Sequence, residues 1–345
     1  MQQAVLREPR TIELITTAVP VPGVGEIVLR VRAALTCGTD LKTYRRGHPR
    51  LPFGPFGHEC AGDVVAVGAG VRHIHEGDAV IPMPTASCGH CDACRRGLEH
   101  LCDEQFTGIV LGAYAEYLLV SAKVVASQLI QKPSQLTYIE AAFAEPLSCV
   151  VHAWAKLRTS RPEHVAVIGL GTIGLLHLLV AKANGVRTIA VGRRPDRLAL
   201  ASTVGTDVVI DSEREPVSEA LRSATGGTGP DVVIECTGAS TLWTQAPQWV
   251  SRGGRVVLFG GLPAGTQVPF DATRLHYDEV DLISSFHFRP TDVAEAERLL
   301  ADRTINVRPI ITGVEPLANI VDVFATLDRS RGVKYALLPE GTAWT

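Results

Sequence analysis

The sequence predicts a two-domain α/β protein, in which a mainly antiparallel β region precedes a doubly wound parallel sheet. The chain has 345 residues, which is about enough for two domains. From residue 4 to about 117, short apolar or alternating runs are broken by glycine and proline, a pattern typical of irregular β structure. From about residue 163 onward, apolar strands, glycine turns and amphipathic helices alternate, which indicates a parallel sheet with right-handed crossovers.

Composition excludes several classes of protein. Apolar residues make up 46% of the chain and charged residues 20%, so a packed core is expected and disorder is not. The 33 basic and 36 acidic residues nearly balance and form no long run. We therefore expect neither a nucleic-acid nor a membrane-surface partner, and small molecules as ligands.

In the first region, strands are expected at 26–31, 61–67 and 78–81, and helical sequence at 138–157 joins it to the second region. The second region has five expected strands. These are Val165–Ile168, Thr188–Val191, Asp207–Ile210, Asp231–Glu235 and Arg255–Phe259. The final segment begins with a helical pattern at 293–301 and ends with a strand-like run at 334–338.

The apolar stretch Val165–Ala183 is better explained by a strand that runs into a buried helix than by a membrane span, since it contains His177 and three glycines. Residues 1–10 show no secretory signal, so a cytoplasmic location is expected. In that reducing compartment, clustered cysteines more often bind metal than form disulfides.

A glycine-rich turn follows the first strand of the second region: Gly169-Leu170-Gly171-Thr172-Ile173-Gly174. In this spacing the first glycine permits a tight turn, the second lets the backbone approach a pyrophosphate, and the third allows a helix to pack closely on the strand. Amides at the helix start then face the phosphates. The segment predicts a dinucleotide site.

The residues that follow the next expected strand, Thr188–Val191, indicate which dinucleotide binds. An acidic residue there would bond the ribose hydroxyls of NAD, but the chain has Gly192, Arg193 and Arg194. Two guanidinium groups without a nearby carboxylate favour the 2′-phosphate of NADP over NAD. The alternative is that both arginines are solvated and that Asp196 contacts the ribose.

Four cysteines follow a C-x2-C-x2-C-x7-C spacing: Cys88, Cys91, Cys94 and Cys102. Four thiolates can close a tetrahedron around Zn²⁺ and leave no open position, so a structural zinc site is predicted. An iron–sulfur cluster and a disulfide pair are the alternatives. His90 and His100 lie in the same stretch and are expected to face solvent.

A second group is dispersed in two short strings, Cys37-Gly38-Thr39-Asp40 and Gly57-His58-Glu59. Together with the glycine turn and the four cysteines, these strings make the chain resemble the zinc-containing medium-chain dehydrogenase/reductase family. It is more similar to the sorbitol and threonine dehydrogenase branches than to classical alcohol dehydrogenases. The resemblance implies a GroES-like catalytic domain, formed by residues 1–150 and 290–345, and a Rossmann cofactor domain at 151–289.

The resemblance also implies the ligands of a catalytic zinc: Cys37 and His58, with Glu59 as a direct or exchanging ligand. Glu145, in the string Glu145-Pro146-Leu147, would be either a ligand or the partner of the zinc-bound water. Thr39 would be the first hydroxyl of a proton relay, whereas Lys42 stands where relatives often have a histidine. The three remaining cysteines, Cys60, Cys149 and Cys236, are interpreted as buried thiols.

On the cofactor side, the resemblance places seven residues around the nicotinamide half and Arg197 near the adenine. The seven are Thr237, Gly238, Phe259, Gly260, Ser284, Ser285 and Phe286. Phe106, Tyr44 and Phe53 are candidates for the substrate pocket or the core. A homo-oligomer is implied, with a tetramer favoured over a dimer.

The leading functional hypothesis is a dehydrogenase with two zinc ions per chain. It would transfer hydride between a secondary alcohol, which is a polyol or sugar-like compound, and NAD(P). NADP is favoured over NAD as the cofactor. One alternative is a threonine-type amino-alcohol dehydrogenase or an aldehyde reductase with the same zinc chemistry. Another, of a different class, is a non-catalytic regulatory protein that binds the cofactor. The zinc-free quinone reductase branch is excluded, since it would lack both ligand groups.

Overall fold

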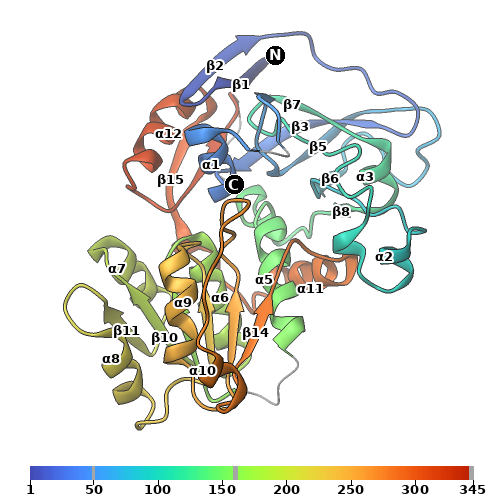
Figure 1. Cartoon of the computed structure of the whole chain (residues 1–345). Helices are drawn as coiled ribbons and strands as arrows, with labels where there is room; N and C mark the ends of the chain where they lie inside the picture. Colours follow the sequence, from blue (N-terminus) through green and yellow to red (C-terminus); the bar gives the residue numbers. More distant parts are fainter. Residues whose placement is uncertain (49–50, 158–161, 342–345) are drawn as a thin grey trace. The chain divides into compact units, whose positions relative to one another are not determined.

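The computed structural model describes residues 1–48, 51–157 and 162–341, which fall into two units (Figure 1). The first unit contains Met1–Pro146, Arg289–Arg303 and Ile311–Thr345. The second contains Leu147–Phe288 and Thr304–Ile310. Residues 304–310, which the sequence assigned to the catalytic domain, therefore cluster with the second unit.

The second unit is built on a six-stranded parallel sheet with the order β11-β10-β9-β12-β13-β14. All five expected strands are present, each with ends within one residue of the prediction, and β14 is an addition. Because the order reverses between β9 and β12, the sheet is doubly wound and has its topological switch point there. The strands are β9 (His164–Ile168), β10 (Arg187–Gly192), β11 (Val208–Asp211), β12 (Val232–Glu235), β13 (Arg255–Leu258) and β14 (Asp281–Ser284).

Helices connect these strands, as Figure 1 shows for the yellow and orange part of the chain. They are α6 (Thr172–Ala183), α7 (Pro195–Thr203), α8 (Val217–Ala224), α9 (Ser240–Trp249) and α10 (Ala272–His276). The glycine turn decides how α6 meets β9. A Cβ on Gly174 would lie 2.0 Å from the carbonyl oxygen of Gly169, so only glycine permits this close packing.

A histidine lies inside this apolar packing. His177, on α6, is fully buried, and its Nδ1 accepts a hydrogen bond of 3.1 Å from Nε1 of Trp154. Its ring meets that of Phe259 edge to face at 5.0 Å. Burial lowers the pKa of His177 to about 3, so this side chain is neutral in the folded protein at neutral pH.

This buried histidine makes stability depend on pH. In the unfolded chain His177 takes up a proton below about pH 6.5, whereas in the folded chain it stays neutral to about pH 3. Stability is therefore lost as pH falls through this window. His177→Gln keeps a hydrogen-bond acceptor for Trp154 but cannot take up this proton. Between pH 7 and pH 5, we expect the free energy of unfolding of this variant to fall by about 2 kcal/mol less than that of the wild-type protein. Urea unfolding at both pH values measures the difference. An identical pH dependence in both proteins would contradict this.

The first unit contains a seven-stranded sheet and a three-stranded sheet. The larger has the order β15-β16-β3-β5-β6-β8, with β7 also paired to β3, and only β15 and β16 run parallel. Its strands are β3 (Ile27–Leu35), β5 (Glu59–Val67), β6 (Ala79–Pro82), β7 (Tyr117–Val120), β8 (Leu129–Gln131), β15 (Ile311–Pro316) and β16 (Lys334–Leu338). The smaller sheet joins β1 (Gln2–Glu8), β2 (Thr11–Thr16) and β4 (Gly54–Pro55).

Short helices link these strands. They are α1 (Gly38–Arg46), α2 (Asp92–Arg95), η1 (Glu99–Leu101), α3 (Ala122–Ser127), α4 (Tyr138–Ala141), α11 (Pro290–Ala301), η3 (Leu317–Asn319) and α12 (Ile320–Asp328). The helix α5 (Ala144–Leu157) runs from the first unit into the second, and η2 (Arg308–Ile310) belongs to the second. None of the described helices is long and apolar enough to span a membrane.

An aromatic cluster anchors the C-terminal segment in the core of the first unit. The ring of Phe324, on α12, lies 5.5 Å from Tyr44, 5.4 Å from Phe56 and 5.8 Å from Tyr114. Tilted and edge-to-face pairs of this kind add to the hydrophobic gain from burial. Tyr44 is therefore a core residue, whereas Phe53 is 45% exposed.

Candidate active site and metal centres

Three possible metal ligands meet where β3 ends and β5 begins. Leu35 pairs with Glu59 in the antiparallel ladder, so Cys37, two residues beyond Leu35, comes next to His58. One possible ligand atom each from Cys37, His58 and Glu59 lies within 4.8 Å of the others. The structure thus brings together two sequence strings that are about twenty residues apart.

Asp40 and Tyr114 orient the histidine. Asp40 Oδ1 lies 3.2 Å from His58 Nδ1, and the Tyr114 hydroxyl lies 2.7 Å from Asp40 Oδ2 and 3.0 Å from the Leu35 carbonyl oxygen. Burial alone would lower the pKa of His58, but attraction to Asp40 and Cys37 raises it well above its usual value. Nδ1 lies close to the Asp40 carboxylate without meeting hydrogen-bond geometry, which leaves Nε2 as the nitrogen available to a metal.

Glu59 is paired with Lys334, the first residue of β16. Oε2 of Glu59 forms an ion pair with Nζ of Lys334, and both side chains are 1% exposed. The second carboxylate oxygen, Oε1, is buried and has no hydrogen-bond partner among the described residues. An unpartnered buried carboxylate oxygen is costly unless something else binds it.

The donor set fits Zn²⁺. A thiolate, an imidazole and a carboxylate are the ligand types that zinc prefers, and three protein ligands leave a fourth position open for substrate. Burial, followed by repulsion from Glu59, raises the pKa of the Cys37 thiol, which a bound metal would counteract by favouring the thiolate.

Glu145, at the start of α5, lies outside this three-residue cluster but within range of its charges. The side chain is 8% exposed, and burial raises its pKa to about 7, with His58 acting in the opposite direction and Glu59 adding to the increase. This environment favours a carboxyl group that can change protonation near neutral pH. Its role as a ligand or as the partner of a water molecule stays a prediction.

The four-cysteine loop also has the geometry of a metal site. Cys94 Sγ lies 3.5 Å from Cys91 Sγ and 3.9 Å from Cys88 Sγ, and all four sulfurs lie within 4.8 Å of one another. Sulfurs bound tetrahedrally to zinc at about 2.3 Å are roughly 3.8 Å apart. Backbone N–H groups point at the sulfurs, including Cys88 N to Cys102 Sγ at 3.2 Å, and such donors favour thiolates.

Two expectations about side chains near these sites need correction. His90 is exposed as expected, but His100 is only 5% exposed because η1 turns it into the protein. Cys60 is buried, whereas Cys149 and Cys236 are only partly buried. Sequence reasoning had treated all three cysteines alike because apolar neighbours in sequence do not report how tightly a side chain is covered.

The expected cofactor residues of the second unit lie at one edge of the parallel sheet, because each follows the carboxyl end of a strand. The glycine turn links β9 to α6. Gly169 has a φ of +96°, and a Cβ there would lie 2.5 Å from Cγ2 of Thr237, which follows β12. Phe259 and Gly260 follow β13, and Ser284 to Phe286 stand at the end of β14.

The end of β10 is shaped by a close contact. A Cβ on Gly192 would lie 2.7 Å from Cδ1 of Leu170, so a side chain here would require the Leu170 side chain to shift. Arg193 is exposed and forms no ion pair or hydrogen bond with the described residues. Arg194 is the N-cap residue of α7.

Arg197 lies in the first turn of α7. Its Nη1 is 3.4 Å from the Leu170 carbonyl oxygen, and its Nε is 3.5 Å from Asp196. Burial, together with repulsion from Arg194, lowers the pKa of Arg197 to about 10, so it still carries its charge at neutral pH. Asp196, the alternative ribose contact, is half exposed and faces this arginine.

Sequence reasoning missed Glu235, the last residue of β12. It is fully buried, and its Oε1 accepts hydrogen bonds from the Thr237 amide at 2.7 Å and the Gly238 amide at 3.2 Å, and from the Thr237 hydroxyl. Burial raises its pKa. An acid at the end of an otherwise apolar strand, three residues before a glycine, is the signal that could have identified it. Asp40, Tyr114 and Lys334 were missed because their partners are distant in sequence.

Both halves of the chain match known family models. Residues 23–132 match the alcohol dehydrogenase GroES-like domain, and residues 172–302 match the zinc-binding dehydrogenase model. Sorbitol dehydrogenase of Bacillus subtilis is 32% identical over 90% of this chain and 89% of its own length. L-threonine 3-dehydrogenase of Pyrococcus abyssi is 36% identical over 87% of both chains.

Comparison with solved structures indicates the same family of dehydrogenases. A zinc-binding dehydrogenase from Sinorhizobium meliloti, bound to NADP, is 31% identical and superimposes with a TM-score of 0.90 over 98% of this chain and 99% of its own. Alcohol dehydrogenase TADH from Thermus sp. ATN1 is 28% identical, with a TM-score of 0.88 over 99% and 100% of the two chains. The chain therefore belongs to the zinc-dependent medium-chain dehydrogenase/reductase family of NAD(P)-dependent oxidoreductases, in the branch of the sorbitol and threonine dehydrogenases.

Proposed function

We propose that this protein transfers hydride between a secondary alcohol and NADP, and that the alcohol is a polyol or a sugar-like compound. The observation that carries the proposal is the cluster of Cys37, His58 and Glu59, with its unpartnered carboxylate oxygen. These three side chains would hold the catalytic zinc, with Glu145 as a further ligand or as the partner of a water molecule. Cys88, Cys91, Cys94 and Cys102 would hold a structural zinc.

When bound, zinc supplies a Lewis acid for the substrate oxygen, and the nicotinamide supplies the hydride acceptor. The residues of the chain position and deprotonate the substrate. Asp40 fixes the orientation of His58, and Lys334 fixes one oxygen of Glu59. As the first group of a proton relay, the Thr39 hydroxyl would accept the proton of the alcohol while donating its own proton onward to water. Lys42 is exposed on α1, and no role for it in this relay is proposed.

Two local features support NADP over NAD. No acidic side chain can stand at Gly192 without displacing Leu170, and Arg193 offers a guanidinium that no described residue engages. A 2′-phosphate is a suitable partner for such a group. The Sinorhizobium meliloti relative was solved with NADP bound.

The double variant Arg193→Ala/Arg194→Ala tests this preference. We expect it to lower kcat/KM for NADP by about a hundredfold, because two charge-assisted hydrogen bonds to phosphate are lost, and to change kcat/KM for NAD only a few-fold. Arg187→Ala, at the opposite end of the same strand, is the matched control and should change neither. A wild-type enzyme that prefers NAD would refute the assignment.

A second candidate substrate class is a threonine-type amino alcohol, favoured by the similarity to L-threonine 3-dehydrogenases. Turnover of polyols, sugars, amino alcohols, simple secondary alcohols and aldehydes with both cofactors, followed by nicotinamide absorbance, separates the two classes. Cofactor binding without turnover of any of them would instead support a regulatory protein. We also propose a homotetramer, to be tested by light scattering against the 36.9 kDa mass of one chain.

A further inference from the structure

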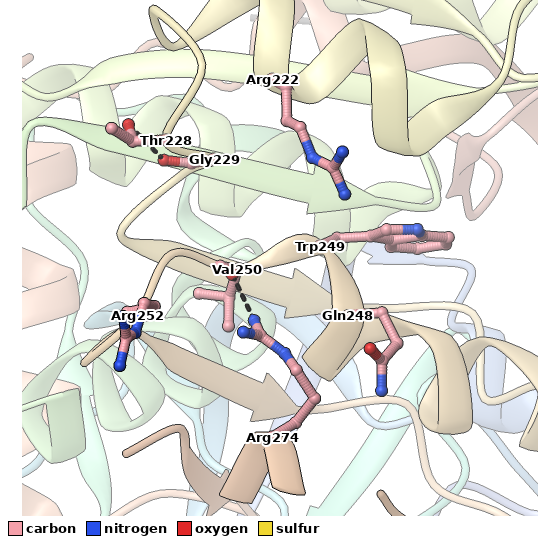
Figure 2. A pocket seen from close by; sticks show the side chains of 8 residues that line it. All are labelled: Arg222, Thr228, Gly229, Gln248, Trp249, Val250, Arg252 and Arg274. Carbon is pink, nitrogen blue, oxygen red and sulfur yellow. Dashed lines mark hydrogen bonds between the residues drawn. The ribbon is translucent and has the colours of Figure 1, made fainter. Parts of the chain in front are cut away.

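We propose that the second unit carries a binding site for a small oxyanion, at the edge of its parallel sheet opposite to the glycine turn. A cavity of about 200 Å³ opens where the connections lead into the amino ends of β12 and β13 (Figure 2). Because cofactor residues follow the carboxyl ends of the strands, this cavity is separate from the dinucleotide site. Its lining residues are Arg222, Thr228, Gly229, Gln248, Trp249, Val250, Arg252 and Arg274.

The lining contains three arginines and no acidic residue. Arg274 is engaged by the fold: it donates to the carbonyl oxygens of Pro247 at 2.9 Å and Val250 at 2.6 Å, which lie at the carboxyl end of α9. Its Nη1 also bonds Asp278 at 2.5 Å. Arg274 thus caps a helix and adds positive charge to one wall of the cavity.

Asp278 is the acid that neutralises part of this charge, and two arginines share it. Arg252 Nε lies 3.0 Å from Asp278 Oδ1, while Arg274 bonds the other carboxylate oxygen. One negative charge therefore serves two guanidinium groups. The lining keeps a surplus of positive charge even before Arg222 is counted.

Arg222 lies in the last turn of α8 and is also part of the lining. Its guanidinium has no ion pair or hydrogen bond to any residue in the described part of the chain. Figure 2 shows Arg222 and Arg274 on opposite sides of this open, solvent-accessible cavity, with Trp249 and Gln248 along one flank. The unengaged guanidinium of Arg222, with the positive charges of Arg252 and Arg274 in the same lining, suits an oxyanion, which accepts several charge-assisted hydrogen bonds at once.

The volume of the cavity limits the size of the ligand that can bind in it. Pockets for drug-sized molecules are usually about 300–1,000 Å³, so a space of about 200 Å³ favours a phosphate group over a whole nucleotide. The ligand is inferred to be inorganic phosphate or the phosphoryl group of a small ester. Both present the same tetrahedral oxyanion to the arginines.

Titration of the purified full-length protein with inorganic phosphate, at constant ionic strength in chloride, tests the proposal through tryptophan emission and calorimetry. We expect saturable binding, an emission change that Trp249→Phe removes, and a Kd raised about tenfold or more by Arg222→Met. A parallel titration with glycerol phosphate distinguishes the two sources, since tighter binding of the ester would identify an ester and weaker binding the free ion.

Two controls separate this site from the cofactor arginines and from general charge. Arg193→Ala/Arg194→Ala should bind phosphate at the cavity as wild type does, and Arg72→Met, which removes an exposed arginine of the first unit, should also have no effect. The turnover of Arg222→Met should match that of wild type and shows that the variant is folded. Phosphate binding unchanged by Arg222→Met, or no saturable binding to the wild-type protein, would overturn the proposal.

Discussion

His58→Ala is expected to lower the zinc content from two ions per chain to one and to reduce kcat/KM by about a thousandfold or more. The imidazole is one of three clustered ligand donors, and Asp40 holds it in position. Without it, the cluster has only Cys37 and Glu59, and a Lewis acid supplies several kcal/mol of transition-state stabilisation, each 1.4 kcal/mol being about tenfold in rate. Metal analysis of the dialysed protein, combined with steady-state kinetics on the best substrate of the screen, measures both effects.

The matched control is Cys60→Ala. Cys60 is a buried thiol in β5, two residues beyond His58, but it does not belong to the ligand cluster. We expect this variant to keep two zinc ions and turnover within a few-fold of wild type. A His58→Ala protein that retained two zinc ions and wild-type turnover would disprove the assignment of the catalytic site.

Lys334→Met is expected to destabilise the first unit by about 3–5 kcal/mol, because it leaves Oε2 of the buried Glu59 carboxylate without its ion-pair partner. Both side chains are 1% exposed, so water cannot replace the lost partner. Lys334 Nζ also lies 5.4 Å from the centre of the Phe143 ring, a contact that methionine would keep only as packing. Urea unfolding of the zinc-loaded protein, followed by circular dichroism, measures the change.

The double variant Glu59→Gln/Lys334→Met separates the ion pair from simple loss of packing. Removing both charges avoids an uncompensated buried ion, so the double variant should be more stable than Lys334→Met alone, although it loses a metal ligand. Additive effects of the two single substitutions would show that Lys334 matters for packing and not for the charge of Glu59.

The fold of the second unit was largely predictable because its signals are local. Strand, glycine turn and helix follow one another in sequence, and the five expected strands have ends within one residue of those observed. The strand β14 was missed because only two of its four residues, Leu282 and Ile283, are apolar, and none of the four is fully buried. Residues 304–310 were assigned to the other domain because no change of composition marks where the chain crosses between units.

The sequence by itself determined the chemistry available to this protein. Spacing alone grouped four cysteines, the glycine turn predicted a dinucleotide site, and the two arginines after β10 favoured NADP, since these residues act through neighbours along the chain. Family resemblance was needed to connect Cys37 with His58, because nothing in their spacing requires them to meet.

Only the tertiary structure decided how those groups are supported. Lys334 is 275 residues from Glu59, and Tyr114 is 74 residues from Asp40, yet both pairs are in direct contact. The arginine-lined cavity also depends on tertiary structure, since its lining residues come from α8, α9, α10 and the connections that precede β12 and β13. Contacts of this kind depend on how β3, β5 and β16 pair and on how the helices pack against the sheet, and sequence periodicity reports which residues are apolar but not which buried polar groups face each other.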